Sequence, residues 1–182
     1  MKQAVLISIK PRWCELIASG KKTVEVRKTR PNMLAPFKCY IYQTQGKVGT
    51  GLYKHGGVEI MGRDVKSGKV IGEFICNMIL PISIGCNKPE KLTPCEIHGY
   101  GLTDIEIMDY LGNGVTGYAW YITDLKIYDT PKELSEFKRW NRTEENVPCA
   151  HVKWLYPPCE VCKDCNLQRP PQSWCYVEEL KE

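Results

Sequence analysis

Hydrophobic residues recur along the chain in short runs, and their spacing predicts an α+β protein. The run at 4–9 is apolar except for Ser8, a pattern typical of a strand buried on both faces. Helical spacing follows from Pro11, which suits a first helical turn, and Gly20 is placed to end that helix. Alternation at 23–27 then predicts a second strand, with its two valines facing the core.

The rest of the chain adds further strands and short helices. The strands are expected at 38–44, 69–82, 118–122 with its continuation 124–128, and 173–177. Helices are expected at 103–111, capped by Thr103 and Glu106, and at 131–137, capped by Thr130. Because the strands do not alternate with helices in βαβ order, the pattern favours a small mixed or antiparallel β-barrel of about six strands with two or three short helices.

Two segments interrupt this pattern. Residues 45–68 are rich in glycine and predict a long excursion, built as a loose hairpin, on the rim of the fold. Gly72, shortly after it, is expected to mark a bulge or bend in its strand. Residues 149–168 form a cysteine-rich C-terminal insert. We therefore expect a single domain over residues 1–182 that carries two insertions.

Charge and hydropathy narrow the possible partners. Lysine and arginine number 25 against 21 acidic residues, and a net charge of +4 is too small for a protein that holds duplex DNA mainly through its phosphates. No apolar stretch approaches the roughly 20 residues of a membrane helix. The apolar start is interrupted by Ser8 and ended by Lys10 before any cleavage site, unlike a secretory signal. We expect a soluble cytoplasmic protein without membrane contact, and no heptad pattern predicts an oligomer.

Charged and polar residues gather where the first helix meets the second strand. On an extended strand Thr23, Glu25 and Arg27 share one face with Lys21. Lys21 and Lys22 point to opposite faces if the strand has already begun, so only one of them can enter a pocket. The cluster suggests a pocket for a polar, anionic ligand. The alternative is a solvated turn with a ladder of charges that contributes little stability.

The same residues carry a resemblance to a known family. The segment 7–11, the short helix and the run Gly20-Lys21-Lys22-Thr23-Val24-Glu25-Val26-Arg27-Lys28 together resemble the signature of the ASCH domain, a member of the PUA-like superfamily of small β-barrels. Residues 117–128 and 169–179 resemble a bacterial and phage branch of this family. The resemblance covers most of the chain apart from the two insertions. It implies a PUA-like barrel that binds RNA or a modified nucleoside or nucleotide.

Some members of the family resemble amidohydrolases that remove an acetyl group from N4-acetylcytidine. The resemblance implies that Lys22 would be the nucleophile or base, and Glu106 is a candidate for the family's catalytic glutamate. Glu25 stands where those enzymes have threonine. A carboxylate beside the lysine favours the ammonium form, whereas a nucleophilic lysine must lose its proton. This departure favours binding over catalysis.

Three functions therefore stay open. The first is an RNA-binding or nucleoside-binding module whose charged cleft is formed by Lys21, Lys22, Thr23, Glu25 and Arg27, with Arg27 taking a phosphate or a base edge. The second is a hydrolase of an N4-acylated cytidine, and the third is a protein-interaction domain. Trp13, Trp120 or Tyr121 would stack on a bound base, although aromatic residues of a barrel more often belong to its core.

Eight of the ten cysteines fall into two groups, and the other two, Cys86 and Cys95, form a looser set with His98 that we interpret as loop and packing residues. Cys14, Cys39 and Cys76 stand singly in apolar segments, where free cysteine behaves as a small buried hydrophobe. The remaining cysteines include five in the last fifth of the chain, and this crowding indicates metal binding in a reducing compartment.

A structural Zn²⁺ is the metal that the insert predicts. Cys159 and Cys162 have the Cys-x-x-Cys spacing that lets two thiolates reach one ion, and Cys165 and Cys149 complete a tetrahedral set most simply. His151 is an alternative fourth ligand, and Cys175 is a less suitable one because it lies in a predicted strand. The competing interpretation, adjacent free thiols on a surface loop, is disfavoured because exposed cysteines oxidise.

Overall fold

A computed structural model describes residues 2–45, 53–55, 58–60, 68–83, 99, 101, 103–112, 116–140 and 166–181. In chain order the elements are β1 (Gln3–Ile9), α1 (Pro11–Ala18), β2 (Val24–Arg27), β3 (Phe37–Gln43), β4 (Tyr53–His55), β5 (Val58–Ile60), β6 (Lys69–Ser83), α2 (Asp104–Leu111), β7 (Thr116–Lys132), the 3₁₀ turn η2 (Leu134–Glu136) and β8 (Trp174–Glu178). The six predicted strands of the main sheet are confirmed, and the two predicted segments at 118–128 are one continuous strand.

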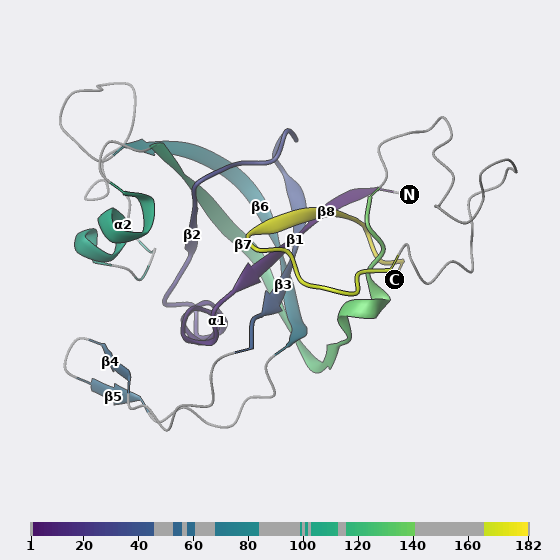
Figure 1. Ribbon diagram of the computed structural model, residues 1–182, viewed down its shortest axis with the longest axis horizontal. Helices are drawn as coiled ribbons and strands as arrows, with labels where there is room; N and C mark the ends of the chain where they lie inside the picture. Colours follow the sequence, from purple (N-terminus) through teal and green to yellow (C-terminus); the bar gives the residue numbers. More distant parts are fainter. Residues whose placement is uncertain are drawn as a thin grey trace, which may run out of the picture.

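The main sheet is mixed, as predicted, but it is open and not closed into a barrel. Its strand order is β2-β7-β6-β3-β1-β8, and β1 and β3 are its parallel pair while the other neighbours are antiparallel. Figure 1 shows the sheet strongly curved. Side chains link its two ends: Arg27 Nη2 donates to the Ser8 carbonyl at 2.6 Å, and Trp174 Nε1 donates to Thr29 Oγ1 at 3.0 Å. Among the described strands, β2 and β8 share no backbone ladder, and a further contact between the two ends is made by Asn32 N, which donates to the Tyr176 hydroxyl of β8 at 2.7 Å.

The first two helices begin and end as the sequence predicts. Pro11 opens α1, and Gly20 beyond it has a φ of 73°, which a residue with a Cβ adopts at a cost. Thr103 and Glu106 form the reciprocal capping box of α2. The predicted helix at 131–137 is wrong. There β7 continues through Lys132 and leaves room for η2 only, with Glu133 at its N-cap.

The two faces of the sheet are buried by different elements. Strand β1 contributes to both, as its apolar pattern predicts, and α1 packs on one face, which we call the inner face. The cluster on the inner face includes Val5, Ile7, Ile9, Cys14, Ile17, Phe37, Cys39, Phe74, Cys76 and Trp120. On the outer face, Ile107 and Leu111 of α2 cover Val24 and Val26. A separate outer cluster contains Leu6, Tyr40, Phe137 and Val177. The two valines of β2 therefore face the core, as predicted.

One backbone irregularity of β6 and the hairpin of the excursion lie where the sequence predicts them. The β6–β7 register shifts between Val70 and Gly72, which confirms the predicted bulge. A Cβ on Gly72 would lie 2.5 Å from the carbonyl oxygen of Lys126, so only glycine lets the two backbones approach this closely. Within the glycine-rich excursion, β4 and β5 pair as an antiparallel hairpin. The division into one domain with two insertions stays a prediction.

Candidate functional site

The turn between α1 and β2 carries Lys22 into the protein interior. After Gly20 the chain folds back, and Lys22 N donates to the Leu16 carbonyl at 2.9 Å. Lys22 is 2% exposed, and its Nζ donates to the Val24 carbonyl at 2.7 Å. Lys21 is exposed. The sequence predicts that one of the two lysines enters, and the structure identifies it as Lys22.

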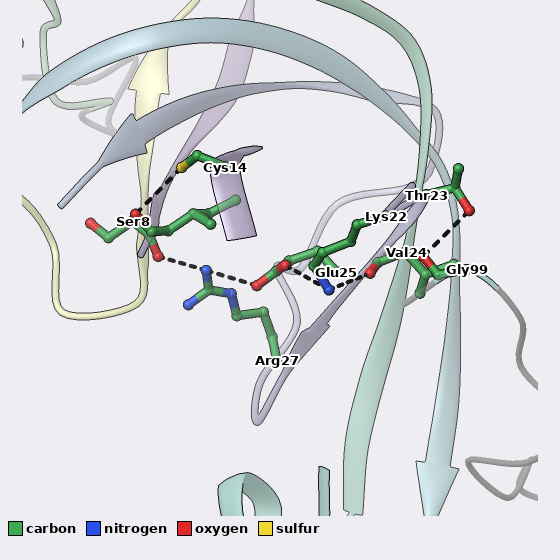
Figure 2. A network of polar contacts seen from close by, with 9 residues as sticks. Ser8, Cys14, Lys22, Thr23, Val24, Glu25, Arg27 and Gly99 are labelled. Atoms are coloured by element: carbon green, nitrogen blue, oxygen red, sulfur yellow. Dashed lines mark hydrogen bonds and ion pairs between the residues drawn. The ribbon is translucent and has the colours of Figure 1, made fainter. Parts of the chain in front are cut away.

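Glu25 joins Lys22 and Arg27 in one buried cluster, which we call the ion network. Glu25 Oε2 lies 3.3 Å from Lys22 Nζ, and Glu25 Oε1 lies 3.1 Å from Arg27 Nη2. Arg27 also donates to the Ser8 carbonyl. Figure 2 shows the Glu25 carboxylate between the two cations. Charges taken out of water are tolerated when each has an opposite partner and hydrogen bonds. In the ion network each charge has an opposite partner, whereas Glu25 Oε2 and Arg27 Nε have no hydrogen-bond partner among the described residues.

Thr23 and Lys21 do not join the ion network. Both are exposed, and Thr23 instead approaches residue 99: its backbone N donates to the Gly99 carbonyl at 2.6 Å. The predicted shared face fails here because β2 begins only at Val24. Alternation applies within a strand, so it places Glu25 and Arg27 together but does not constrain the turn residues before them.

Burial sets the protonation chemistry of Lys22. Loss of hydration lowers the pKa of its ammonium from the usual 10.5, although Glu25 beside it opposes this change. The sequence predicts the opposite effect, a stabilised ammonium form of Lys22, because it shows the nearby Glu25 carboxylate but not the burial of the lysine. A lysine with a lowered pKa reaches the free amine more readily, which is the form that attacks a carbonyl carbon.

Residues of α1 and α2 lie beside the ion network. The Trp13 ring has the Arg12 guanidinium 4.3 Å and Lys22 Nζ 5.6 Å from its centroid. Arg12 in turn pairs with Glu106 Oε1 at 2.9 Å. Glu106 Oε2 accepts from the Thr103 backbone N at 2.9 Å, so both carboxylate oxygens of the catalytic candidate are engaged. Despite partial burial, bonding to Thr103 and the charge of Arg12 lower the pKa of Glu106, which keeps it ionised.

Two buried donors on the inner face have no hydrogen-bond acceptor within the described part of the chain. They are Arg27 Nε and Trp120 Nε1. Glu25 and Trp120 are opposite residues in the β2–β7 ladder, so their side chains share a face. Trp120 is fully buried against Phe37 and Trp174, which confirms a place in the core. Buried donors without acceptors are uncommon, and a water or ligand oxygen at either atom would complete its hydrogen bonding.

Sequence reasoning missed Arg12 and Ser8 as parts of this region. Arg12 carries no motif signal beyond its position in the first helical turn beside Trp13. Ser8 is visible as the one polar residue in the run at 4–9, and the structure explains it: its carbonyl accepts from Arg27, and its Oγ donates to the Pro171 carbonyl at 2.7 Å. A polar break in an otherwise apolar buried strand is therefore a usable signal.

The single cysteines are core residues, as predicted. Cys14, Cys39 and Cys76 are buried. Burial raises the pKa of each thiol, that of Cys76 to about 12, so these groups stay protonated at neutral pH. Thiols in this state are poor nucleophiles and poor metal ligands.

The predicted zinc ligands lie outside the described residues. These are Cys149, Cys159, Cys162 and Cys165, together with the alternative ligand His151. Cys175, the other alternative, lies in β8 as expected. In the part of the chain that the structure describes, no three His, Cys, Asp or Glu side chains are grouped to hold a metal ion. The zinc site stays a prediction. None of the described helices is long and apolar enough to cross a membrane.

The protein is similar to known proteins in its structure, whereas no protein-family model and no curated protein matches its sequence. The crystal structure of ASCH from Zymomonas mobilis matches with 18% identity and a TM-score of 0.57, over 97% of this chain and 88% of that one. A serine-to-alanine mutant of the same protein matches with 18% identity and a TM-score of 0.56, over 97% and 89%.

A tyrosine-to-phenylalanine mutant of the Zymomonas mobilis protein matches over 73% of this chain and 77% of that one, with 21% identity and a TM-score of 0.52. Two of these three similarities extend over nearly the whole chain, and all three agree with the resemblance that the residues around Lys22 carry. The chain therefore has the fold of ASCH proteins.

Proposed function

We propose that the protein binds RNA or a modified nucleoside at the ion network of Lys22, Glu25 and Arg27. The observation that carries this proposal is the burial of these three charged side chains on the inner face, at the motif that resembles the ASCH signature. A solvated turn, the competing interpretation, would leave these side chains in water. Burial of charge is costly and occurs mostly where a site needs it.

The chemistry of the site suits the edge of an unpaired base. Base edges present carbonyl oxygens and ring nitrogens, which are acceptors for the unused donors Arg27 Nε and Trp120 Nε1. Unstacked bases bind to aromatic rings or arginine planes, and the half-buried Trp13 and Arg12 offer both beside Lys22. The proposed cleft would open between these two side chains and the α1–β2 turn.

The test compares ligand binding to two adjacent lysine variants. Cytidine, N4-acetylcytidine, cytidine 5′-monophosphate and a short single-stranded RNA are titrated into the wild type, Lys22→Met and Lys21→Met. We expect the wild type and Lys21→Met to bind at least one of these ligands and Lys22→Met to bind about tenfold more weakly or worse, which corresponds to about 1.4 kcal/mol. Circular dichroism verifies that each variant is folded.

Equal affinities in all three proteins, or no binding by the wild type, would contradict the proposal and favour the third function, a protein-interaction domain.

Amide hydrolysis is the second candidate, and the lowered pKa of Lys22 favours it. In this reaction the free amine of Lys22 would take a proton from a water molecule that attacks the acetyl carbonyl of an N4-acylated cytidine; the bond from that carbon to N4 breaks, N4 receives the proton, and acetate and cytidine leave. In the alternative route the amine itself attacks the carbonyl, the same bond breaks to release cytidine, and water then hydrolyses the acetyl-lysine to acetate and the free amine. Incubation of the protein with N4-acetylcytidine separates the two candidates. Release of cytidine by the wild type and not by Lys22→Met supports hydrolysis, whereas binding without release supports a binding module.

A further inference from the structure

A second recess lies on the outer face of the sheet. It has a volume of about 400 Å³, and its lining includes Lys38, Glu73, Lys126, Tyr128, Lys132 and Lys181. Tyr40, Glu73 and Lys126 are paired in register across β3, β6 and β7, so their side chains share one face. Tyr40 packs with Leu6 in the outer cluster. The recess is therefore on the opposite side of the sheet from α1 and the inner cluster.

Polar contacts connect the side chains at the floor of the recess, which are Lys38, Glu73, Tyr128 and the neighbouring Glu179. Lys38 Nζ lies 3.4 Å from Glu73 and 3.2 Å from Glu179, and the Tyr128 hydroxyl donates to the other oxygen of Glu73. Although burial disfavours its ammonium, the contacts with Glu179 and Glu73 raise the pKa of Lys38. Both oxygens of Glu73 are thus engaged, and Lys38 is shared by two carboxylates, so the floor keeps one excess negative charge.

The other three lysines of the recess are not matched by carboxylates. Among the described residues, no carboxylate oxygen lies within the 4.0 Å of an ion pair from Lys126, Lys132 or Lys181. Lys132 is positioned by Tyr128, whose ring centroid lies 5.4 Å from Lys132 Nζ. Three like charges at one recess repel one another, and an anion between them would remove this repulsion.

We propose that this recess binds a phosphate group through Lys126, Lys132 and Lys181. Lysine binds phosphate as a point charge, and three ammonium groups offset the charge of a phosphate dianion. The volume lies within the range of small-ligand pockets, so the phosphate of a free ion, a nucleotide or an RNA backbone can enter. This site does not depend on the ion network on the inner face.

The experiment uses two double variants with equal charge. In Lys126→Gln/Lys132→Gln the recess loses two cations, and in Lys10→Gln/Lys28→Gln the protein loses two cations elsewhere. Inorganic phosphate and a short single-stranded RNA are each titrated into the wild type and both variants by calorimetry at low ionic strength. We expect the recess variant to bind both probes at least tenfold more weakly and the control variant to bind inorganic phosphate about as tightly as the wild type. For RNA the slope of log K against log salt should also fall by about 0.7 for each lysine removed.

The two probes distinguish the source of the phosphate. Saturable binding of inorganic phosphate that the recess variant loses supports a free phosphate or nucleotide, and RNA binding without phosphate binding, lost in the same variant, supports an RNA backbone. Equal affinities in the two double variants, or no response to either probe, would overturn the proposal. Lys22→Met should leave the response to inorganic phosphate unchanged, so this proposal and the base-binding proposal fail separately.

Discussion

Glu25 and Arg27, two residues apart on β2, form a buried ion pair with 3.1 Å between Glu25 Oε1 and Arg27 Nη2. Alternate residues of a strand share a face, so the pair runs along the inner face and leaves the outer face of β2 to its valines. The second oxygen of Glu25 faces Lys22. One carboxylate is therefore shared by two cations, and the trio keeps one excess positive charge.

Removing that carboxylate should destabilise the protein strongly. In Glu25→Gln, Lys22 and Arg27 would remain buried without a negative partner, and breaking a buried pair in this way typically costs about 3–5 kcal/mol. We expect a free energy of unfolding lower by this amount in chemical denaturation. Glu15→Gln is the matched control because Glu15 is exposed on α1, and it should change stability by less than about 0.5 kcal/mol. Similar losses in both variants would show that the ion network is not what Glu25 stabilises.

The stability contribution of Lys22 should depend on pH. Its pKa is lower in the folded protein than the value of 10.5 in the unfolded chain, so between these two values the unfolded chain binds more protons. The cost of burying the ammonium is complete below the folded pKa and is relieved as pH rises toward 10.5. The free energy of unfolding of the wild type, minus that of Lys22→Met, should therefore increase with pH by about 1.4 kcal/mol for each unit between the two pKa values. A difference that stays constant or falls over alkaline pH would contradict the lowered pKa.

Variants of the α2 capping box can distinguish a structural role of Glu106 from a catalytic role. Thr103→Ala removes the hydroxyl that accepts from the Glu106 backbone N, and loss of such a cap should cost about 1 kcal/mol of stability. Glu106→Gln can still cap and loses only the half-exposed pair with Arg12, so it should cost less than about 1 kcal/mol. If the glutamine variant instead abolishes any hydrolysis of N4-acetylcytidine without loss of stability, then Glu106 acts in the reaction.

The zinc site predicted from Cys149, Cys159, Cys162 and Cys165 can be tested by metal content. Elemental analysis of protein purified without added metal should find one zinc ion per chain. A variant with Cys159→Ser and Cys162→Ser should lose the ion, because two of the four ligands are removed. Cys175→Ser should keep it, since that residue lies in β8. A folded preparation of the wild type without zinc would refute the site.

The sequence predicts the parts of the fold that local patterns determine. The apolar run at 4–9, the capping box at Thr103 and the bulge at Gly72 all depend on neighbouring residues or on a property of one residue, and all are confirmed. The helix predicted from Thr130 is wrong because tertiary pairing extends β7 through this segment, and such pairing overrides a weak local preference.

The candidate site is predictable in its residues but not in its energetics. The motif identifies Lys22, Glu25 and Arg27, and strand alternation places the last two together. Burial of Lys22 depends on the packing of α1 against the sheet, which no local pattern contains. For the same reason the effect of desolvation on its pKa was not expected. The sequence does not predict the outer recess, because the β3–β6–β7 register brings Lys38 beside the lysines of β7 and Lys181 reaches it from beyond β8.

The pairing of β1 with β8 has a consequence for how the chain is made. Gln3 lies opposite Glu178 and Ile7 opposite Trp174, so β1 leaves the ribosome long before its antiparallel partner β8 is made. Until residues 174–178 leave the ribosome, β1 exposes a row of unpaired backbone groups beside its parallel partner β3. During synthesis this apolar edge would be the segment most prone to associate with other nascent chains, and a chaperone that shields it would improve the yield of folded protein.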